Sequence, residues 1–256
     1  MNNVVQIDSY RKRKTSPKNP KILTTVMYLL ILAVAFYFFL HSSFFNIKKI
    51  SVTGNKLLEK EKILNLSQVK TGQNLISIDK GEIKKRILVH PLVKDVEIKR
   101  NLPTTLEIEI KEREPIGLVV CPDGFIQVCD EGYFLALIDD LGSYNLPVIS
   151  GLSLEQLPGP GQKIENQGLF NALAILKEGK QGFLENIVEL NISNENHILA
   201  YTVQGIEIRL GTLENMSTKL ENLNKILEDV INKEIMGNSV EYIDLRFSGP
   251  PVIKKK

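Results

Sequence analysis

The 256-residue sequence has little net charge and no excess of one sign that would dominate the whole chain. Its 32 Lys and Arg residues are nearly balanced by 30 Asp and Glu residues, which leaves a formal charge of +2 at pH 7. So small a charge provides no overall field that attracts nucleic acid. With 43% hydrophobic and 24% charged residues, the composition suits a folded protein of one or two domains.

Residues that carry chemistry are also scarce. The three histidines, His41, His90 and His197, do not have the spacing of metal ligands. The only neighbouring acidic pair of note, 139–140, lies in a loop-like segment, and adjacent side chains point apart. No Ser-x-x-Lys or Lys-Thr-Gly motif of penicillin-binding enzymes occurs. We therefore expect no catalytic residue, no metal, no cofactor and no small-molecule substrate.

The two cysteines, Cys121 and Cys129, lack the short Cys-x-x-Cys spacing of zinc and redox sites. The segment around them predicts a β-hairpin with its turn at 123–124. In that register Cys121 lies opposite Ile126, and Cys129 lies opposite Leu118 on the other face. This geometry does not suit a disulfide, so we expect two free thiols.

A long uncharged segment, 22–40, stands near the start of the chain and reads "ILTTVMYLLILAVAFYFFL". At 1.5 Å per residue its 19 residues match a hydrocarbon core about 30 Å thick. It predicts an uncleaved transmembrane anchor. A cleaved signal peptide, which has a shorter apolar region, and a buried core helix are the alternatives.

The segment before the anchor, 1–21, is a basic tail interrupted by Pro17 and Pro20, and it is expected to be disordered. Under the positive-inside rule this tail lies in the cytoplasm and residues 41–256 lie outside it. A nuclear signal or nucleic-acid patch is the alternative interpretation of the basic run. The basic residues of the tail are Arg11, Lys12, Arg13, Lys14, Lys18 and Lys21, against Asp8.

Residues 45–114 predict a small β-α-α-β-β domain. Apolar and charged residues alternate on both sides of 101–103, as in Val96 and Ile98 before it. This alternation predicts two strands joined by a loop. If the apolar side chains of both strands face one core, the loop has an odd number of residues, and the three residues 101–103 are the natural choice. Gly54 is expected to supply a left-handed turn after the first strand. The other predicted elements are strand 47–55 and helices 59–69 and 80–91.

Residues 115–249 predict a second, mostly β domain, followed by an exposed tail at 250–256. Its turns are marked by Gly and Pro, and a long apolar stripe indicates a helix packed on a sheet rather than a coiled-coil seam. The predicted elements are a three-stranded meander at 116–138, a loop at 139–162, a helix at 166–178, strands at 185–192, 197–203 and 205–210, a helix at 213–233 capped by Thr212, and a strand at 239–249. The predicted fold class is α+β.

Several segments resemble the FtsQ/DivIB family of bacterial cell-division proteins. The resembling segments are "ISVTGN", "TGQNLISID", "HPLVKDVEIKRNLPTTLEIEIKEREP", "CDEGYF", "NLPVISG" and "EYIDLRFSG". The first three resemble the family's POTRA module, and the likeness runs from the anchor to the C-terminus. The resemblance implies a POTRA-like domain followed by a mixed, mostly antiparallel sheet with flanking helices.

The family consists of bitopic scaffolds of the division septum without known catalysis. The resemblance therefore implies that this chain binds small bitopic coiled-coil proteins of the FtsL and FtsB/DivIC types. Through them it would help to control the septal peptidoglycan synthase complex from the extracytoplasmic side of the cell membrane. A POTRA-type chaperone for polypeptide export and an anchored cell-wall hydrolase or synthase are the alternatives.

The matching motif at the end of the chain implies that the partner is bound by Arg246, Phe247, Ser248, Gly249 and Val252. An edge strand offers unpaired N–H and C=O groups to which a partner strand can bind. Phe247 stands where the family can have an aromatic hydroxyl. The two prolines at 250–251 remove two donors, so we expect the pairing to stop or bend at residue 249. The alternative is that Ile243, Leu245 and Phe247 form the core face of an ordinary strand.

Overall fold

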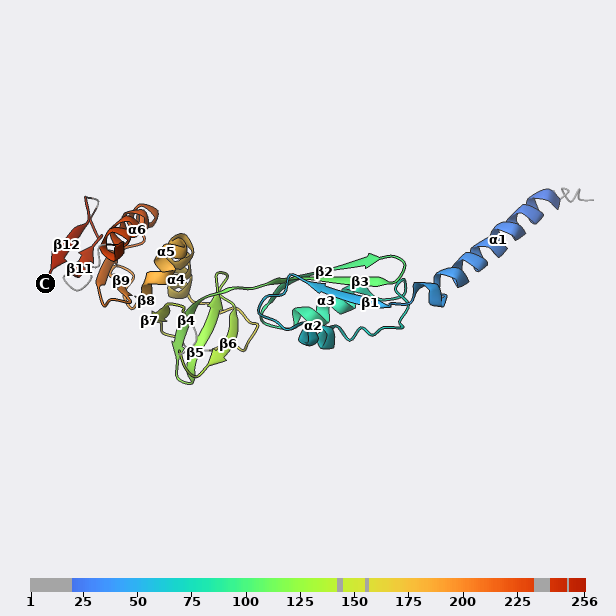
Figure 1. Cartoon of the computed structure of the whole chain (residues 1–256), viewed down its shortest axis with the longest axis horizontal. Helices are drawn as coiled ribbons and strands as arrows, with labels where there is room; N and C mark the ends of the chain where they lie inside the picture. Colours follow the sequence, from blue (N-terminus) through green and yellow to red (C-terminus); the bar gives the residue numbers. More distant parts are fainter. Residues whose placement is uncertain (1–19, 142–144, 155–156, 233–239, 248) are drawn as a thin grey trace, which may run out of the picture. The chain divides into compact units, whose positions relative to one another are not determined.

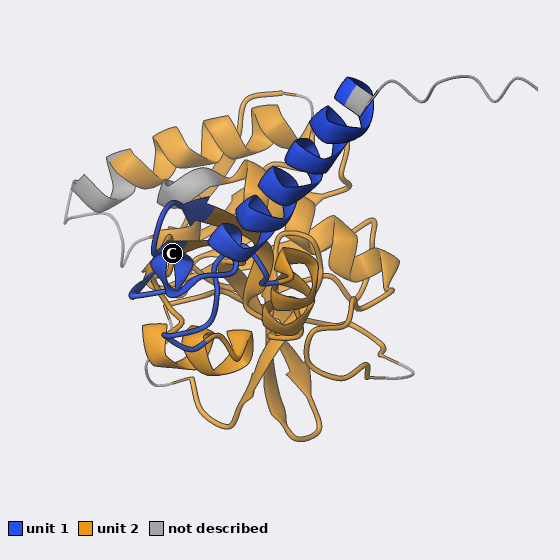
Figure 2. Ribbon diagram, turned by 90° about the vertical axis from the view of Figure 1, so that its right-hand side faces the viewer, with its two compact units in different colours: residues 1–50, 70–78, 100–106 blue, residues 51–69, 79–99, 107–256 orange. Residues whose placement is uncertain are grey.

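The computed structural model describes residues 20–141, 145–154, 157–232, 240–247 and 249–256 (Figure 1). The predicted basic tail, apart from its last two residues, and Ser248 lie outside the described residues. Contacts between residues divide the chain into two compact units, which Figure 2 colours differently. The first contains residues 1–50, 70–78 and 100–106, and the second contains the remainder.

The described helices and strands follow the order in Figure 1. The helices are α1 (Pro20–Leu40), the short 3₁₀ helix η1 (Ser43–Phe45), α2 (Lys60–Ser67), α3 (Lys80–Leu88), α4 (Gln167–Glu178), α5 (Lys180–Asn186) and α6 (Met216–Asn232). The strands are β1 (Lys49–Thr53), β2 (Val93–Asn101), β3 (Thr105–Glu112), β4 (Pro115–Cys121), β5 (Gly124–Cys129), β6 (Phe134–Ile138), β7 (Val148–Ser150), β8 (Ile187–Asn191), β9 (Ile198–Thr202), β10 (Glu207–Gly211), β11 (Val240–Asp244) and β12 (Val252–Lys255).

Helix α1 contains the apolar segment found in the sequence. Its Lys21–Leu40 portion has a mean hydropathy of 2.4 over the most apolar window, and none of that window is buried against other parts of the protein. By length and composition it is the one helix among the described residues that can cross a membrane. A buried core helix, one of the alternatives, does not fit this exposure.

The β-α-α-β-β domain has the predicted order of elements. Its three strands form a sheet in the order β1-β3-β2, with α2 and α3 on one face (Figure 1). Ile63, Ile83 and Ile87 on the helices are buried, as are Leu106 and Ile108 on β3. The turn between β2 and β3 has three residues, as expected, but it comprises 102–104 rather than 101–103.

The second domain contains a nine-stranded sheet in the order β12-β11-β10-β9-β8-β7-β4-β5-β6. Three neighbouring pairs are parallel and five are antiparallel, so the prediction of a mixed, mostly antiparallel sheet is confirmed. Buried residues of α4, α5 and α6 share one apolar core with the strands.

Three elements of this domain before β11 differ from the sequence prediction. The predicted loop at 139–162 contains β7, and α5 follows α4 directly. Helix α6 begins at Met216 rather than at 213. Asn215, with φ of 53°, occupies a left-handed conformation just before it. Thr212 is therefore not its cap.

The cysteines are both free, as expected, although the predicted hairpin register is wrong. Strands β4 and β5 place Cys121 opposite Gly124 and Cys129 opposite Pro115. The turn residues are therefore 122–123 rather than 123–124. Cys129 is buried and Cys121 is half-buried.

Within the second unit, Arg113 joins the end of β3 to residues on both sides of the domain boundary. One of its terminal nitrogens donates to the carbonyl oxygens of Pro91 and Val93. Its guanidinium carbon lies 4.1 Å from the ring centroid of Tyr133, a cation–π arrangement. Glu131 lies 3.8 Å from the Arg113 Nε and 2.6 Å from the Lys94 Nζ.

Gly54 lies in the turn after β1, where the β-α-α-β-β domain is closely packed. Gly54 has φ of +81°, which confirms the expected left-handed turn, and a Cβ there would overlap the Ile110 carbonyl oxygen. Gly72 is a matched control, since its φ is +90° and no atom lies within 4 Å of the position that a Cβ would take. We expect Gly54→Ala to lower the free energy of unfolding by about 3 kcal/mol and Gly72→Ala by about 1 kcal/mol.

Urea unfolding of the purified protein in detergent, followed by circular dichroism, measures both changes. Equal losses for the two variants would show that the Ile110 carbonyl imposes no constraint on Gly54.

Candidate partner-binding site

The C-terminal edge of the nine-stranded sheet is formed by β12, which the sequence analysis did not predict. The expected strand at 239–249 is shorter, and β11 ends at Asp244. The chain then turns through the two prolines at 250–251, and β12 pairs antiparallel with β11, with Ile253 opposite Ile243. The expected tail at 250–256 is thus an edge strand, and it covers the edge of β11.

All four residues of β12 are exposed, including the apolar Val252 and Ile253, with 53% and 42% of their surfaces accessible. In an antiparallel edge strand, alternate residues direct their N–H and C=O groups away from the neighbouring strand. The outer side of β12 therefore presents a ladder that another extended chain can continue.

The residues predicted to bind a partner lie partly together. Arg246, Phe247 and Gly249 line a small cleft of about 150 Å³ beside the beginning of α6, whereas Val252 begins β12. Phe247 is 68% exposed and so does not belong to the core. The other lining residues of the cleft are Thr212, Glu214, Asn215, Thr218, Lys219, Asn222, Leu245 and Pro251.

Two of the neighbouring apolar residues are structural, which was the alternative interpretation. Ile243 has no exposed surface, and Leu245 has 3%. Both belong to the core beneath the sheet. The side chain at 247 is the first apolar one after this core segment to be exposed to solvent, so a partner can reach it without displacing the core.

An ion pair fixes the chain where β11 ends. The Nε of Arg246 donates to both carboxylate oxygens of Asp244, and a terminal nitrogen of Arg246 lies 2.6 Å from the Asp244 Oδ2. The Arg246 backbone N–H also donates to this carboxylate. The Arg246 guanidinium lowers the pKa of Asp244, whose side chain is almost fully buried.

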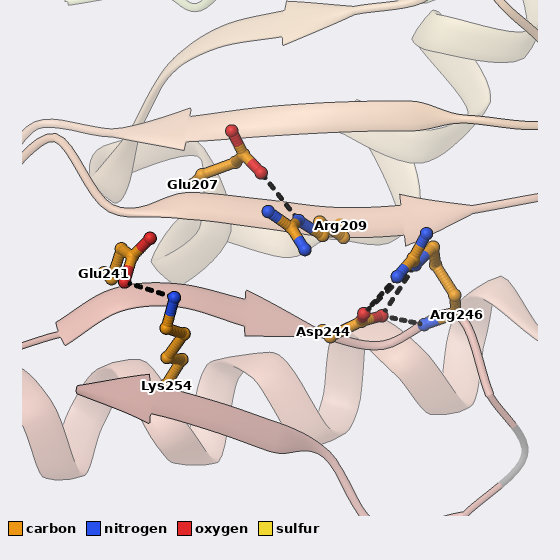
Figure 3. A network of polar contacts seen from close by, with 6 residues as sticks. All are labelled: Glu207, Arg209, Glu241, Asp244, Arg246 and Lys254. Atoms are coloured by element: carbon orange, nitrogen blue, oxygen red, sulfur yellow. Dashed lines mark hydrogen bonds and ion pairs between the residues drawn. The ribbon is translucent and has the colours of Figure 1, made fainter. Parts of the chain in front are cut away.

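A second group of charged side chains lies on the face of the sheet beside this ion pair (Figure 3). Arg209 on β10 pairs with Glu207 at 2.7 Å, and its guanidinium carbon lies 3.7 Å from the ring centroid of Tyr242. Lys254 on β12 pairs with Glu241 at 2.9 Å and lies 5.5 Å from the same ring. These contacts connect three neighbouring strands up to the edge.

The sequence analysis did not single out Ile253 and Lys254, which form part of the edge, or Tyr242, which lies on the neighbouring strand. A signal for β12 was present, because a β-branched pair at 252–253 favours a strand. A signal for the Asp244–Arg246 pair was present as well, since residues two apart on an extended chain share a face.

The site suits a polypeptide rather than a small reactant. It combines an open backbone ladder, an exposed aromatic ring at Phe247 and a fixed guanidinium at Arg246. Among the described residues, no group of three or more His, Cys, Asp or Glu side chains could hold a metal ion. These features define a protein that carries a β-α-α-β-β domain and a larger β domain with an exposed edge strand.

Comparison with known proteins identifies both domains. Residues 45–113 match the model of the FtsQ-type POTRA domain, and residues 122–246 match that of the FtsQ/DivIB C-terminal domain of cell division proteins. The chain belongs to the FtsQ/DivIB family of cell division proteins.

Individual relatives agree with this assignment. The chain is 32% identical over 216 residues to the cell division protein DivIB of Clostridium tetani, a match that covers 82% of this chain and 79% of the relative. It is 27% identical to the cell division protein FtsQ of Geotalea daltonii, over 84% of this chain and 77% of the relative. The solved extracytoplasmic domain of DivIB from Geobacillus stearothermophilus is 16% identical over 48% of this chain and 98% of that domain, with a TM-score of 0.36, which is too low to bear on the fold.

The Asp244–Arg246 pair predicts a pH-dependent contribution to stability. Because the folded pKa of Asp244 is depressed, its contribution is complete above the unfolded value of about 3.9 and is lost as the pH falls through the folded pKa. We expect Asp244→Asn to lower the melting temperature at pH 7 by about 2–4 °C, the shift for about 1 kcal/mol once solvent screening at the exposed Arg246 is considered.

Melting curves between pH 2 and 7 measure this difference, which should begin to narrow below about pH 4 and close as the pH falls through the folded pKa of Asp244. Asp123→Asn, at the exposed turn after β4, is the control for the loss of one carboxylate. A gap of constant size across the whole range would contradict the assigned role of the pair.

Proposed function

We propose that the protein is a bitopic scaffold of the bacterial division machinery that acts by binding partners stoichiometrically. Its membership in the FtsQ/DivIB family supports a role in cell division. The further steps of the proposal are the membrane anchor, the orientation of the chain, and the mode and identity of partner binding.

Helix α1 is the membrane anchor in this proposal. Its length and hydropathy fit a bilayer, and its side chains are exposed as lipid-facing side chains would be. The basic residues before it favour a cytoplasmic N-terminus, which leaves the POTRA and β domains outside, at the division septum.

The partners are small bitopic coiled-coil proteins of the FtsL and FtsB/DivIC types, and a strand of one of them extends the sheet at β12. The single observation that carries this step is the exposure of every residue of β12 at the end of a nine-stranded sheet. Main-chain hydrogen bonds to the outer side of β12 provide affinity. Phe247 and the cleft beside it provide specificity for one side chain of the partner. Through these partners the scaffold helps to control the septal peptidoglycan synthase complex.

Phe247 provides the first test. We expect Phe247→Asp to abolish co-purification of FtsB/DivIC-type proteins from solubilised membranes, because a buried carboxylate without a partner is costly at an interface. Val203→Asp is the matched control, since Val203 is 61% exposed in a turn of the same domain. Retained binding by the Phe247 variant would exclude this side chain from the interface, and failure of the wild type to retrieve any such protein would overturn the scaffold proposal.

A proline scan of β12 tests the mode of binding. Proline removes the backbone donor at each position from 252 to 255 in turn. If the partner adds a strand to β12, proline at two alternate positions should weaken binding of the partner at least about tenfold, while the melting temperature stays within a few degrees. Proline at the other two positions should lower the melting temperature, because the N–H groups there pair with β11. Loss without this alternation would show that the partner binds side chains rather than the edge.

A further inference from the structure

The first unit joins α1 to loops that come from much later in the chain (Figure 2). The side-chain amide nitrogen of Asn74 donates to the carbonyl oxygens of Leu40 and Ser42, at 3.0 and 3.3 Å. The backbone N–H of Leu75 donates to the Phe45 carbonyl oxygen at 2.8 Å. The last carbonyls of a helix lack partners within it, so Asn74 caps the end of α1.

The turn between β2 and β3 is hydrogen-bonded to the segment that follows η1. The backbone N–H groups of Lys48 and Lys49 both donate to the Thr104 carbonyl oxygen, at 2.9 and 3.3 Å. Lys48 follows Phe45 by only three positions, which corresponds to at most about 10 Å of extended chain. A terminal nitrogen of Arg100 donates to the Ile78 carbonyl oxygen at 2.6 Å and joins this turn to the capping loop.

The charge of this region differs from that of the whole chain. Residues 41–50, 70–78 and 100–106, the part of the first unit that follows α1, contain Lys48, Lys49, Lys70 and Arg100 and no Asp or Glu. The three lysines are exposed. The chain as a whole has nearly equal numbers of basic and acidic residues.

Large apolar side chains accompany these cations. Leu102, in the turn, is 60% exposed, and Phe44 in η1 is 56% exposed. The rings of Phe39, Phe44 and Phe45 contact one another with centroids 5.1–5.8 Å apart, so an aromatic cluster continues from the end of α1 into η1. Exposed apolar residues next to lysines are the combination that enters the boundary between lipid headgroups and acyl chains.

We infer that Phe44, Lys48, Lys49, Lys70 and Leu102 form a juxtamembrane surface that rests on the leaflet at which α1 ends. In this arrangement Leu102 and Phe44 enter the headgroup boundary, and the three lysines contact anionic phospholipid headgroups. The inference rests on the proposed function in one respect, because it takes α1 to be the membrane anchor. Its consequence is that the chain is attached to the bilayer by a second contact besides the helix.

The absence of tryptophan from the chain allows a direct test with single-tryptophan variants of the full-length protein in lipid vesicles. Leu102→Trp reports on the juxtamembrane surface. Val34→Trp, in the apolar part of α1, reports on the anchor, and Val89→Trp, at a 75% exposed position of the second unit, is the aqueous control. The vesicles contain phosphatidylglycerol or phosphatidylcholine, each with or without brominated acyl chains, which quench only tryptophans that reach the lipid.

We expect a blue-shifted, bromolipid-quenched emission at position 102 in phosphatidylglycerol vesicles and a clearly weaker effect in phosphatidylcholine. The combined Lys48→Glu, Lys49→Glu and Lys70→Glu changes should reduce the quenching in phosphatidylglycerol to the phosphatidylcholine level. Raising the salt to about 1 M should do the same, because the Debye length falls to about 3 Å. Lys60→Glu, Lys62→Glu and Lys80→Glu, three exposed lysines of the second unit, are the matched control and should change nothing.

The outcomes separate the inference from the proposed function. Quenching at position 34 with none at position 102 would overturn the juxtamembrane surface while leaving the anchor intact. Equal quenching at 102 in both lipids, unaffected by the lysine changes, would overturn the role of anionic headgroups. No quenching at position 34 would overturn the anchor itself.

Discussion

The C-terminal domain depends on one very short strand. β7 has three residues, and it pairs in parallel with β4 on one side and with β8 on the other. Its central residue, Ile149, has no exposed surface. A Cβ at Gly117 would lie 3.0 Å from the Ile149 Cδ1, so glycine at that position leaves the space that this side chain occupies. Because hydrogen bonds continue through β7, the hairpins of β4–β6 and the edge at β12 belong to a single sheet.

That continuity matters for a protein whose proposed task is to hold others in place. In the proposed binding mode, a partner strand at β12 would be hydrogen-bonded to the sheet whose first strand in the chain, β4, begins shortly after Arg113. The Arg113 side chain binds carbonyl groups at the start of β2 and stacks on Tyr133. These polar contacts connect the POTRA domain to the C-terminal domain within the second unit.

The elements with strong periodicity were predictable from the sequence, and short or locally ambiguous ones were not. The β-α-α-β-β order followed from alternation in the strands and from helical spacing at Ile63, Ile83 and Ile87. β7 and β12 have three and four residues, too few to show a period, and Pro-rich or Gly-rich segments flank both. The Asp-Gly pair at 123–124 is a strong hairpin signal, but Gly124, with φ of +126°, pairs with Cys121 and the turn lies one residue earlier.

For the site, the motif located Arg246 and Phe247 near the edge but could not show which strand is outermost. That depends on the direction of the chain after the prolines, which is a tertiary feature. The charged end of β12 has a consequence of its own. If the edges of two copies met antiparallel, lysines at 254 and 255 would lie across from one another or from their neighbours, and like charges on opposing strands repel. Homotypic pairing is therefore disfavoured, whereas a strand without lysines at these positions would not meet this repulsion.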